Sequence, residues 1–188
     1  MTLLMKKLNQ ILFFIGCFFF IVQDAAAKVD PPNYEFSLTE LETFAPGASF
    51  ESLKTKYGKA FPVKSSDGSK VYKFYVAQIR YKFPVYVQIV NDKVIDFYAT
   101  LPTYFLHDVF HQSLINKLGK QDFYQLVEKN AIYIWNNKNG VKHIYSGTCT
   151  ITCFPLYYSQ IKVGQSGKTD SLRPLVETIS KIEAAQKQ

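Results

Sequence analysis

The sequence predicts an α+β protein made of two tandem units, each a helix–loop–helix plus an antiparallel β-meander, followed by a C-terminal helix. Apolar residues first recur at 3- and 4-residue spacing, as on one face of a helix, and then at a spacing of two, as in half-buried strands. This order of helical and alternating patterns occurs twice along the chain. Val, Ile, Tyr and Phe, which suit a pleated surface, are concentrated in the alternating segments.

The composition is that of a folded protein with an unusually aromatic interior or surface. The chain has 188 residues, enough to bury a hydrophobic core in one or two small domains. Hydrophobic residues make up 47% and charged residues 20%, which excludes a disordered or low-complexity chain. Aromatic residues reach 16%, with 13 Tyr and 16 Phe, a share above that of most enzyme domains.

Residues 1–27 have the three parts of a secretory signal peptide. Two lysines form the positive first part, residues 8–22 are almost continuously apolar, and three alanines at the end offer a small-residue cleavage site. We therefore expect cleavage after Ala27 and a periplasmic or secreted protein. The alternative is an uncleaved membrane anchor, but the longest unbroken apolar run is shorter than the ~20 residues that a spanning helix needs. Downstream the sequence has no second such stretch, so we expect no membrane span after cleavage.

Cys17 follows a glycine, as the acylated cysteine does in a lipoprotein signal. However, residues 18–22 continue the apolar run beyond it, and Phe14 is bulky where a small aliphatic residue is usual. The sequence therefore favours an ordinary signal peptide over lipidation at Cys17.

The positive charge is spread along the sequence. Lysine and arginine together number 22 against 15 acidic residues, a formal net charge of +7, and the chain without residues 1–27 keeps +6. Arg80 and Arg173 are the only arginines, whereas nucleic-acid-binding proteins usually gather Arg and Lys on one stripe. We therefore expect no nucleic-acid partner and interpret the charge as a solvated positive surface.

Two cysteines, Cys149 and Cys153, remain after the signal peptide, an even number in an oxidising compartment. In a straight strand they would lie roughly 13 Å apart, whereas a disulfide needs Cα atoms within about 7 Å. The chain must therefore bend if the two cysteines form a disulfide. We favour this disulfide, although the sequence leaves the pairing open. The spacing is too long for a Cys-x-x-Cys redox motif, and a zinc site would need two further ligands.

The first unit spans residues 37–102 and follows an extended, proline-containing lead-in at residues 28–36. Ser37 and Ser49 suit the N-caps of two short helices, and Gly58 suits the end of the second. The apolar faces of these helices consist of Leu38, Leu41, Phe44, Phe50, Leu53 and Tyr57. Strands are predicted at residues 71–79, 82–90 and 94–101, with a turn at Asn91-Asp92 and a stop at Pro102.

The second unit spans residues 103–163 and repeats this order. A helix is predicted at residues 107–118, ending at Gly119, with further strands at residues 131–135, 141–145, 148–154 and 156–163. An Asn-Gly pair between the first two of these strands favours a hairpin. Residues 53–59 and 114–120 share Leu-x-x-Lys-x-Gly-Lys at an offset of 61, which supports an internal repeat.

The chain ends in a linker at residues 164–169 and a helix at residues 170–186. The linker contains Gly-Lys-Thr, but the glycine that begins the linker, Gly164, lies three residues before Gly167, and a phosphate-binding loop needs five. Asp170 or Ser171 would cap the helix. Its apolar stripe consists of Leu172, Leu175, Val176, Ile179 and Ile182, and we expect it to pack on the body of the protein or on a partner.

The stretch from Ala45-Pro46-Gly47 to Gly58-Lys59, followed by a meander, resembles the unit of the small lipoproteins of the outer-membrane assembly machinery. The tandem arrangement resembles the β-lactamase-inhibitory protein family. The resemblance covers about residues 37–163 in the order of elements, and the Pro-Gly…Gly-Lys stretch is its one motif. It implies that an aromatic sheet face binds another protein. Tyr86, Tyr133 and Trp135 are the predicted partner-binding residues, because Tyr and Trp give large contact areas at low entropic cost.

The sharpest pattern for catalysis is His107-Asp108-Val109-Phe110-His111. It places two imidazoles on one helical face, as zinc ligands are placed in metalloproteases, although Asp108 stands where a glutamate is usual. A catalytic zinc generally takes three protein ligands, and His143 is the one other histidine. The sequence has no Gly-x-Ser-x-Gly elbow, no dinucleotide fingerprint and no converging carboxylate pair.

We therefore predict an exported, non-enzymatic protein-binding module with no catalytic residues, metal or cofactor. Its partner would be another envelope or secreted protein, and inhibition of a secreted or envelope enzyme is one form that this function could take. Two alternatives stay open. One is a small metal-dependent hydrolase that uses His107 and His111, and the other is a structural envelope-assembly factor that docks through its C-terminal helix.

Overall fold

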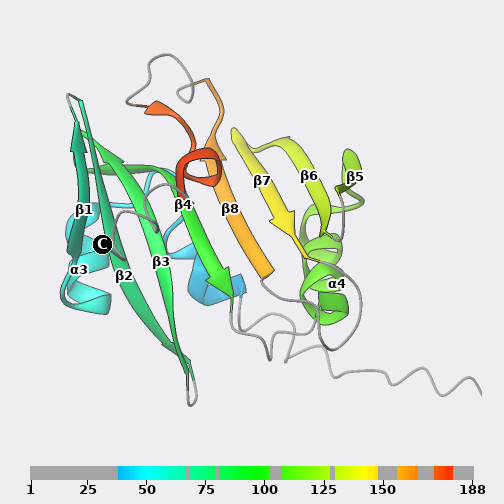
Figure 1. Ribbon diagram of the computed structural model, residues 1–188, viewed down its shortest axis with the longest axis horizontal. Helices are drawn as coiled ribbons and strands as arrows, with labels where there is room; N and C mark the ends of the chain where they lie inside the picture. Colours follow the sequence, from blue (N-terminus) through cyan, green and yellow to red (C-terminus); the bar gives the residue numbers. More distant parts are fainter. Residues whose placement is uncertain are drawn as a thin grey trace, which may run out of the picture.

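The described residues form one eight-stranded antiparallel sheet with the strand order β1-β2-β3-β4-β8-β7-β6-β5 (Figure 1). This computed structural model describes residues 38–66, 68–78, 81–101, 107–127, 130–147, 156–164 and 172–179. Helices accompany the sheet, so the predicted α+β class is confirmed. The first four strands and the last four each form a meander, and the two meanders meet where β4 pairs with β8.

Six of the eight strands in the described part of the chain lie where the alternating pattern predicts them. The strands are β1 (Phe61–Ser66), β2 (Ser69–Gln78), β3 (Tyr81–Val90), β4 (Lys93–Leu101), β5 (Phe123–Val127), β6 (Asn130–Lys138), β7 (Val141–Ser146) and β8 (Leu156–Lys162). The two that sequence analysis missed, β1 and β5, are the two edge strands. Both are short and largely exposed, so neither carries the buried–exposed alternation by which a strand is recognised.

Two predicted turns are confirmed by backbone geometry. Asn91 and Asp92 join β3 to β4 with φ of 50° and 58°, the left-handed values that a tight two-residue hairpin requires. Asn139 and Gly140 join β6 to β7 in the same way, with φ of 53° and 79°. Asn and Asp tolerate these values better than other residues that have a side chain, because they hydrogen-bond locally.

The helices before the meanders begin and end close to their predicted bounds. They are α3 (Phe50–Tyr57) and α4 (His107–Leu118), and residues 38–42 form a further short helical segment. Gly58 and Gly119 follow α3 and α4 with φ of 77° and 80°, as predicted. Ser49 occupies the N-cap position of α3, but its side chain makes no capping hydrogen bond. Its backbone instead pairs with Lys93 at the start of β4.

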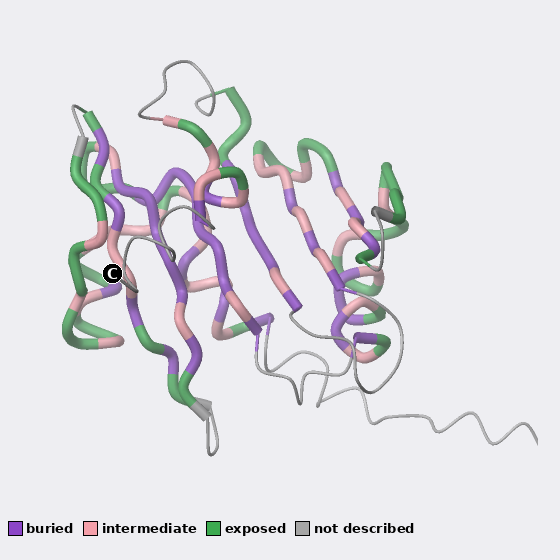
Figure 2. Tube along the Cα trace, viewed as in Figure 1, coloured by how far each residue is buried: buried purple, intermediate pink, exposed green. Residues whose placement is uncertain are grey.

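The main core lies between these helices and one face of the sheet. In the first meander it is formed by Phe44, Leu53, Phe74 and Phe97, each 1% exposed or less. In the second it is formed by Phe110, Leu114, Trp135, Tyr145 and Tyr158. Figure 2 shows this burial running along the central strands and fading toward the two edges of the sheet.

The opposite face of the sheet is partly covered by the C-terminal segment. Of the predicted helix at residues 170–186 the structure describes 172–179, and residues 175–179 are helical. Leu175 and Ile179 pack on Val71, Tyr86 and Tyr98 of the first meander. In Figure 1 this helix lies in front of β4 and β8.

Several predictions concern residues outside the described part of the chain. They are the signal peptide and lead-in, the caps at Ser37, Asp170 and Ser171, Cys149 and Cys153, the strand at residues 148–154 and the linker after residue 164. Among the residues that are described, no helix is long and apolar enough to cross a membrane.

Candidate functional site

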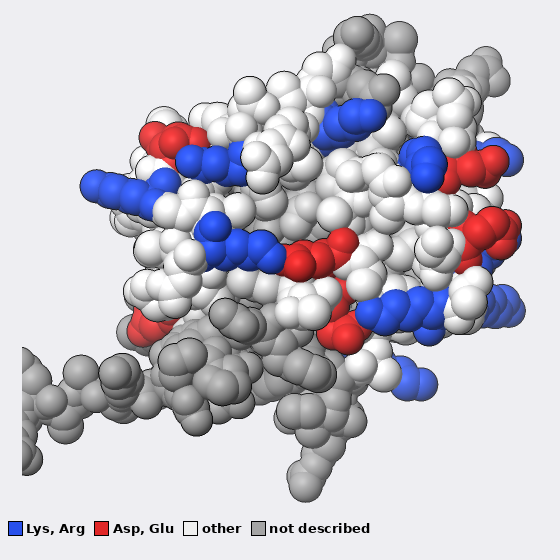
Figure 3. Space-filling view, turned by 180° about the vertical axis from the view of Figure 1, so that it is seen from behind, with Lys and Arg blue, Asp and Glu red and all other residues white. Residues whose placement is uncertain are grey.

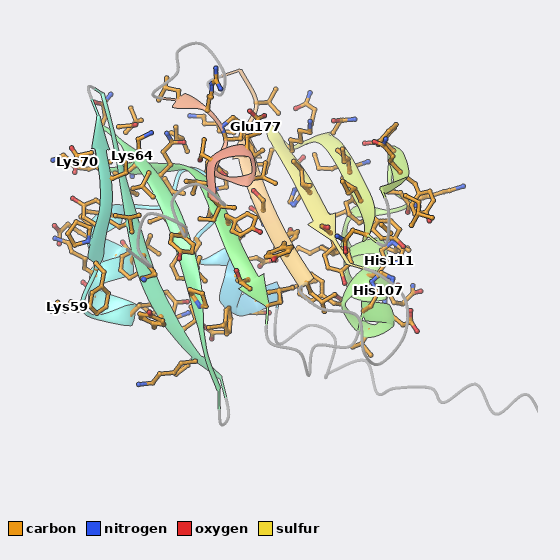
Figure 4. All side chains as sticks on the ribbon, viewed as in Figure 1. Lys59, Lys64, Lys70, His107, His111 and Glu177 are labelled. Carbon is orange, nitrogen blue, oxygen red and sulfur yellow. The ribbon has the colours of Figure 1, made fainter. Side chains whose placement is uncertain are left out.

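The two histidines of the His-x-x-x-His pattern lie on the face of α4 that packs against the sheet (Figure 4). Their rings are stacked, with centroids 5.6 Å apart. His107 Nδ1 lies 3.0 Å from the Tyr145 hydroxyl, and His107 Nε2 lies 3.5 Å from the Tyr133 hydroxyl. His111 packs on Tyr133 with ring centroids 4.0 Å apart. These four residues form a histidine–tyrosine cluster that fills the space between α4, β6 and β7.

Burial keeps the cluster uncharged at neutral pH. It lowers the pKa of His107 and His111 below the ordinary 6.5, and the neighbouring His107 lowers the pKa of His111 further. Burial also raises the pKa of Tyr145 above its ordinary value. Asp108 opposes the shift of His107, but this carboxylate is 90% exposed and its oxygen lies 3.9 Å from His107 Nε2. The cluster is therefore a set of neutral rings, in which hydrogen bonds join His107 to Tyr145 and Tyr133 while His111 packs on Tyr133.

His143 lies on β7 and has partners of its own. Its Nδ1 is 2.8 Å from the Tyr158 hydroxyl, which also accepts a hydrogen bond from Gln160 Nε2 at 3.1 Å. Burial lowers the pKa of His143 to about 4, and the positive charges of Lys117 and Lys138 act in the same direction. It is thus a neutral interior side chain at physiological pH.

The described residues offer no donor set for a catalytic metal. Nowhere in them do three or more His, Cys, Asp or Glu side chains come together in a way that could hold a metal ion. His107 directs Nδ1 at Tyr145, and Asp108 extends into solvent. The His-x-x-x-His pattern here positions α4 on the sheet through the hydrogen-bonded ring of His107 and the packed ring of His111.

The three aromatic residues predicted to bind a partner are all interior. Trp135 is fully buried, and its Nε1 donates a hydrogen bond to the Gly119 carbonyl oxygen at 2.7 Å. Tyr133 is 9% exposed and belongs to the histidine–tyrosine cluster. Tyr86 is 3% exposed and packs under the C-terminal segment. The prediction that they form an exposed binding face is therefore corrected: their contact area is already used within the fold.

Sequence analysis also missed a buried carboxyl on the opposite face of the sheet. Asp96 on β4 is 1% exposed, and its Oδ2 accepts a hydrogen bond from the Leu175 backbone N–H at 2.5 Å. Ser159 Oγ lies 3.4 Å from Asp96 Oδ1 and donates to the Phe97 carbonyl oxygen at 2.7 Å. Burial raises the pKa of Asp96 to about 8, and Glu177 adds to the shift, although the hydrogen bonds from Leu175 and Ser159 oppose it. Asp96 thus fastens the C-terminal segment to the sheet.

Apolar side chains are exposed on β5, at one end of the sheet. Phe123, Tyr124 and Leu126 are 48%, 52% and 59% exposed. The Tyr124 ring lies tilted against the ring of Tyr133, its partner on β6, with centroids 5.2 Å apart, so this surface continues directly from the buried cluster. Figure 2 shows β5 as exposed along its described length. The missed signal was the run Phe-Tyr-Gln-Leu-Val, which is strongly β-forming but lacks the alternation of apolar and polar residues.

Comparison with known proteins gives no family. No protein-family model matches the chain, and no curated protein matches it. A crystal structure of a cysteine-rich secretory protein from Staphylococcus aureus is similar over 70% of this chain, with 13% sequence identity and a TM-score of 0.41. The match spans 47% of that protein's chain.

Proposed function

We propose that this chain is an exported, non-enzymatic protein-binding module that receives its partner along β5. The observation that carries the proposal is an edge strand with three exposed apolar side chains, Phe123, Tyr124 and Leu126. Tyr124 and Leu126 lie on one face of β5 and Phe123 lies on the other. Large exposed apolar side chains are typical of interaction sites. The partner would be another envelope or secreted protein, as the signal-peptide-like residues 1–27 suggest.

The two edges of the sheet support a strand-addition mode of binding. Edge strands are usually protected by proline, lysine or bulges, which prevent other chains from pairing with them. β1 has all three protections, in Pro62, Lys64 and the irregularity between them. β5 has neither proline nor charge between Phe123 and Val127, and its pairing with β6 is regular. We therefore infer that an extended segment of the partner pairs with β5, with its side chains against the exposed rings.

The internal repeat belongs to the same proposal. Residues 37–102 and 103–163 would be two copies of one unit, each with a helix followed by a four-stranded meander. The strand order, in which the fourth strands of the two meanders pair, supports this interpretation. Two such units leave two edge strands, and the second unit would present its edge for binding.

The alternatives gain less support from the described residues. A metal-dependent hydrolase would need His107 and His111 directed at a shared ion, whereas they contact Tyr145 and Tyr133. An assembly factor docking through its C-terminal helix would need a free apolar stripe, whereas Leu175 packs on this chain's own sheet. Inhibition of a secreted or envelope enzyme remains the form of the proposed function that the resemblance to inhibitory proteins suggests.

The test begins with affinity capture from the envelope fraction and culture medium. The bait is the chain from Lys28 onward, which contains every described contact, and captured proteins are identified by mass spectrometry. A candidate partner is then purified and its affinity measured against Leu126→Lys, which places a charge on the edge. We expect at least a 10-fold weakening, the scale of a moderate interface anchor.

The matched control is Val163→Lys, because Val163 is also apolar and 46% exposed but lies after β8. Equal affinity of both variants and the parent chain would refute binding along β5. A stoichiometric metal that is lost in a His107→Ala/His111→Ala variant would instead support the hydrolase alternative.

A further inference from the structure

The positive charge of the protein is concentrated in one part of the fold. Residues 52–91 contain eight basic residues and one acidic residue, so this stretch alone carries a charge of +7, equal to the formal net charge of the whole chain. The stretch forms most of α3 and the strands β1, β2 and β3. The lysines that look scattered along the sequence are therefore gathered at one end of the sheet.

Three of these lysines lie along the edge formed by β1 and β2. Figure 4 shows Lys59, Lys64 and Lys70 at this end of the sheet, far from α4 and its histidines. All three are exposed, and among the described residues none has a carboxylate within 4 Å. Their charges are therefore not neutralised by neighbours on the described part of the chain.

The helix-covered side of the molecule is different. There Lys54 pairs with Glu51, with a nitrogen–oxygen distance of 2.5 Å, and Lys56 pairs with Glu40 at 3.2 Å. Lys117 of α4 pairs with Glu42. Figure 3, seen from behind, shows basic and acidic side chains side by side on this surface. The three lysines of the β1–β2 edge thus differ from Lys54, Lys56 and Lys117, each of which has a carboxylate partner.

Two exposed aromatic rings accompany the lysines. Phe61 and Tyr75 are 36% and 44% exposed, and their rings meet edge to face with centroids 5.8 Å apart. Lys59 Nζ lies 5.0 Å from the Phe61 ring, and Lys73 Nζ lies 5.5 Å from the Tyr75 ring. Rings flanked by lysines suit the boundary between water and a lipid layer, where the ring enters the headgroup region and the ammonium groups remain outside it.

From this arrangement we propose that the β1–β2 edge, with Lys59, Lys64, Lys70, Phe61 and Tyr75, binds the surface of an anionic lipid membrane. Clustered lysines near such a surface are attracted by its negative potential, and this attraction needs no fixed geometry in the lipid.

Two features favour lipid over an acidic protein as the occupant. The basic residues described on this edge are lysines, which act as point charges. Arginine, by contrast, makes planar, bidentate hydrogen bonds to carboxylates and is enriched in protein interfaces. The strand β1 is also closed to backbone pairing by Pro62 and by the irregularity that follows it. A fluid anionic surface requires neither backbone pairing nor a shaped pocket.

The placement also leaves the opposite end of the sheet free. β1 and β5 are the first and last strands in the sheet order (Figure 1). A membrane bound at β1–β2 would therefore not cover the exposed apolar side chains of β5. The lipid proposal stands on the charge and rings of β1 and β2 and is independent of whether β5 binds a protein.

The test is co-sedimentation with vesicles of phosphatidylcholine alone or mixed with phosphatidylglycerol. The protein is the chain from Lys28 onward, so the apolar residues 1–27 do not contribute. We expect binding to the anionic vesicles, weakened by salt because exposed charges are screened. The triple variant Lys59→Gln/Lys64→Gln/Lys70→Gln should bind them roughly 100-fold more weakly, since each lysine near the surface contributes about 5-fold.

The matched control replaces three exposed lysines elsewhere, Lys93→Gln/Lys120→Gln/Lys162→Gln, and so has the same net charge. We expect it to retain most of the binding. Equal losses in the two triple variants would overturn the proposal, because the effect would then be one of net charge alone.

A variant with Phe61→Ala and Tyr75→Ala addresses the rings. Its affinity for anionic vesicles should fall several-fold. The parent chain should keep some binding at raised salt through its rings, and this salt-resistant binding should be missing in the variant. Equal binding of the parent chain to both vesicle types, or no binding to either, would overturn the proposal. Retention on immobilised polyglutamate through the same three lysines, without vesicle binding, would reassign the edge to an acidic protein.

Discussion

The two four-stranded meanders of this protein have interiors of different chemistry. Under the first meander, Phe44, Phe74 and Phe97 pack ring to ring with centroids 5.9 and 6.3 Å apart. Under the second, the corresponding space between α4 and the sheet is filled by the histidine–tyrosine cluster. The comparison shows that a helix-covered antiparallel meander accepts either a core of phenylalanine rings or a polar aromatic core, provided that buried polar atoms find partners.

The outer faces of the two meanders differ as well. Over the first, the C-terminal segment covers Tyr86 and Tyr98 and is fastened by Asp96. Over the second, Ile132 and Ile144 remain half-buried, without a described segment of the chain packed on them. The buried titratable groups are thus divided: a carboxyl with a raised pKa serves the first meander, and histidines with lowered pKa values serve the second.

The largest expected effect is a loss of stability when a buried ring is removed from either interior. Trp135→Ala and Phe97→Ala should each lower the free energy of unfolding by about 3–5 kcal/mol, because both remove a large, fully buried ring. Urea unfolding followed by circular dichroism measures this loss. If Trp135→Ala kept full stability and lost only partner binding, the surface role predicted from the sequence would be restored.

The next effect is the pH dependence of the first meander. The pKa of Asp96 is about 8 when folded, against 3.8 for a free aspartic acid. Between these values the folded chain holds a proton that the unfolded chain has released, so this residue makes stability fall as pH rises. Asp96→Asn should remove that slope because an amide does not titrate. Its oxygen can still accept the Leu175 N–H, so the segment stays attached. Unfolding free energies across this pH range measure it, and identical slopes for both chains would contradict the assignment.

The second meander should respond to pH in the opposite direction. His107, His111 and His143 have folded pKa values below 6.5, so the unfolded chain binds protons first as pH falls. Their contribution to stability is therefore complete above pH 6.5 and lost on acidification, toward pH 4 for His143. Replacing His143 by Gln should flatten the acid side of the stability profile while leaving the slope due to Asp96. A variant that kept the full acid-side slope would assign it to other groups.

Two substitutions on α4 should distinguish the imidazole that makes a hydrogen bond, His107, from the one that makes none in the described part of the chain, His111. His107→Phe leaves the buried Tyr145 hydroxyl without its partner and should cost about 1–3 kcal/mol at neutral pH. His111 Nε2 is buried without a hydrogen-bond partner among the described residues, so His111→Phe should be neutral or stabilising. Thermal and urea unfolding compare the two, and equal destabilisation would show that His111 has a role that its described contacts do not reveal.

The smallest effect on stability is expected at the β5 edge. Leu126→Lys changes an exposed side chain and should alter the unfolding free energy by within about 0.5 kcal/mol. The same substitution is the one expected to weaken partner binding. A large loss of stability would mean that Leu126 is covered in the native protein, and the edge would then be a structural contact.

Much of the fold could be predicted because its strands and helices have one buried and one exposed side. The helix at residues 107–118 was predicted with its observed bounds, and the hairpins at Asn91-Asp92 and Asn139-Gly140 follow from local turn chemistry. Edge strands were missed because exposure on both faces removes the alternation. The predicted binding residues failed for a related reason: a tyrosine or tryptophan in a strand looks the same in sequence whether its ring faces solvent or a helix.

The sequence by itself determined the α+β class, the turns and the order of helix and meander, because these depend on spacing and on the local preferences of glycine, asparagine and β-forming residues. The tertiary structure alone decided which residues meet across the sheet. It brought Asp96 to Leu175, His107 to Tyr145, and Lys59, Lys64 and Lys70 to one edge. Those contacts depend on strand order and on which face each side chain takes, and both are set by the packing of distant segments.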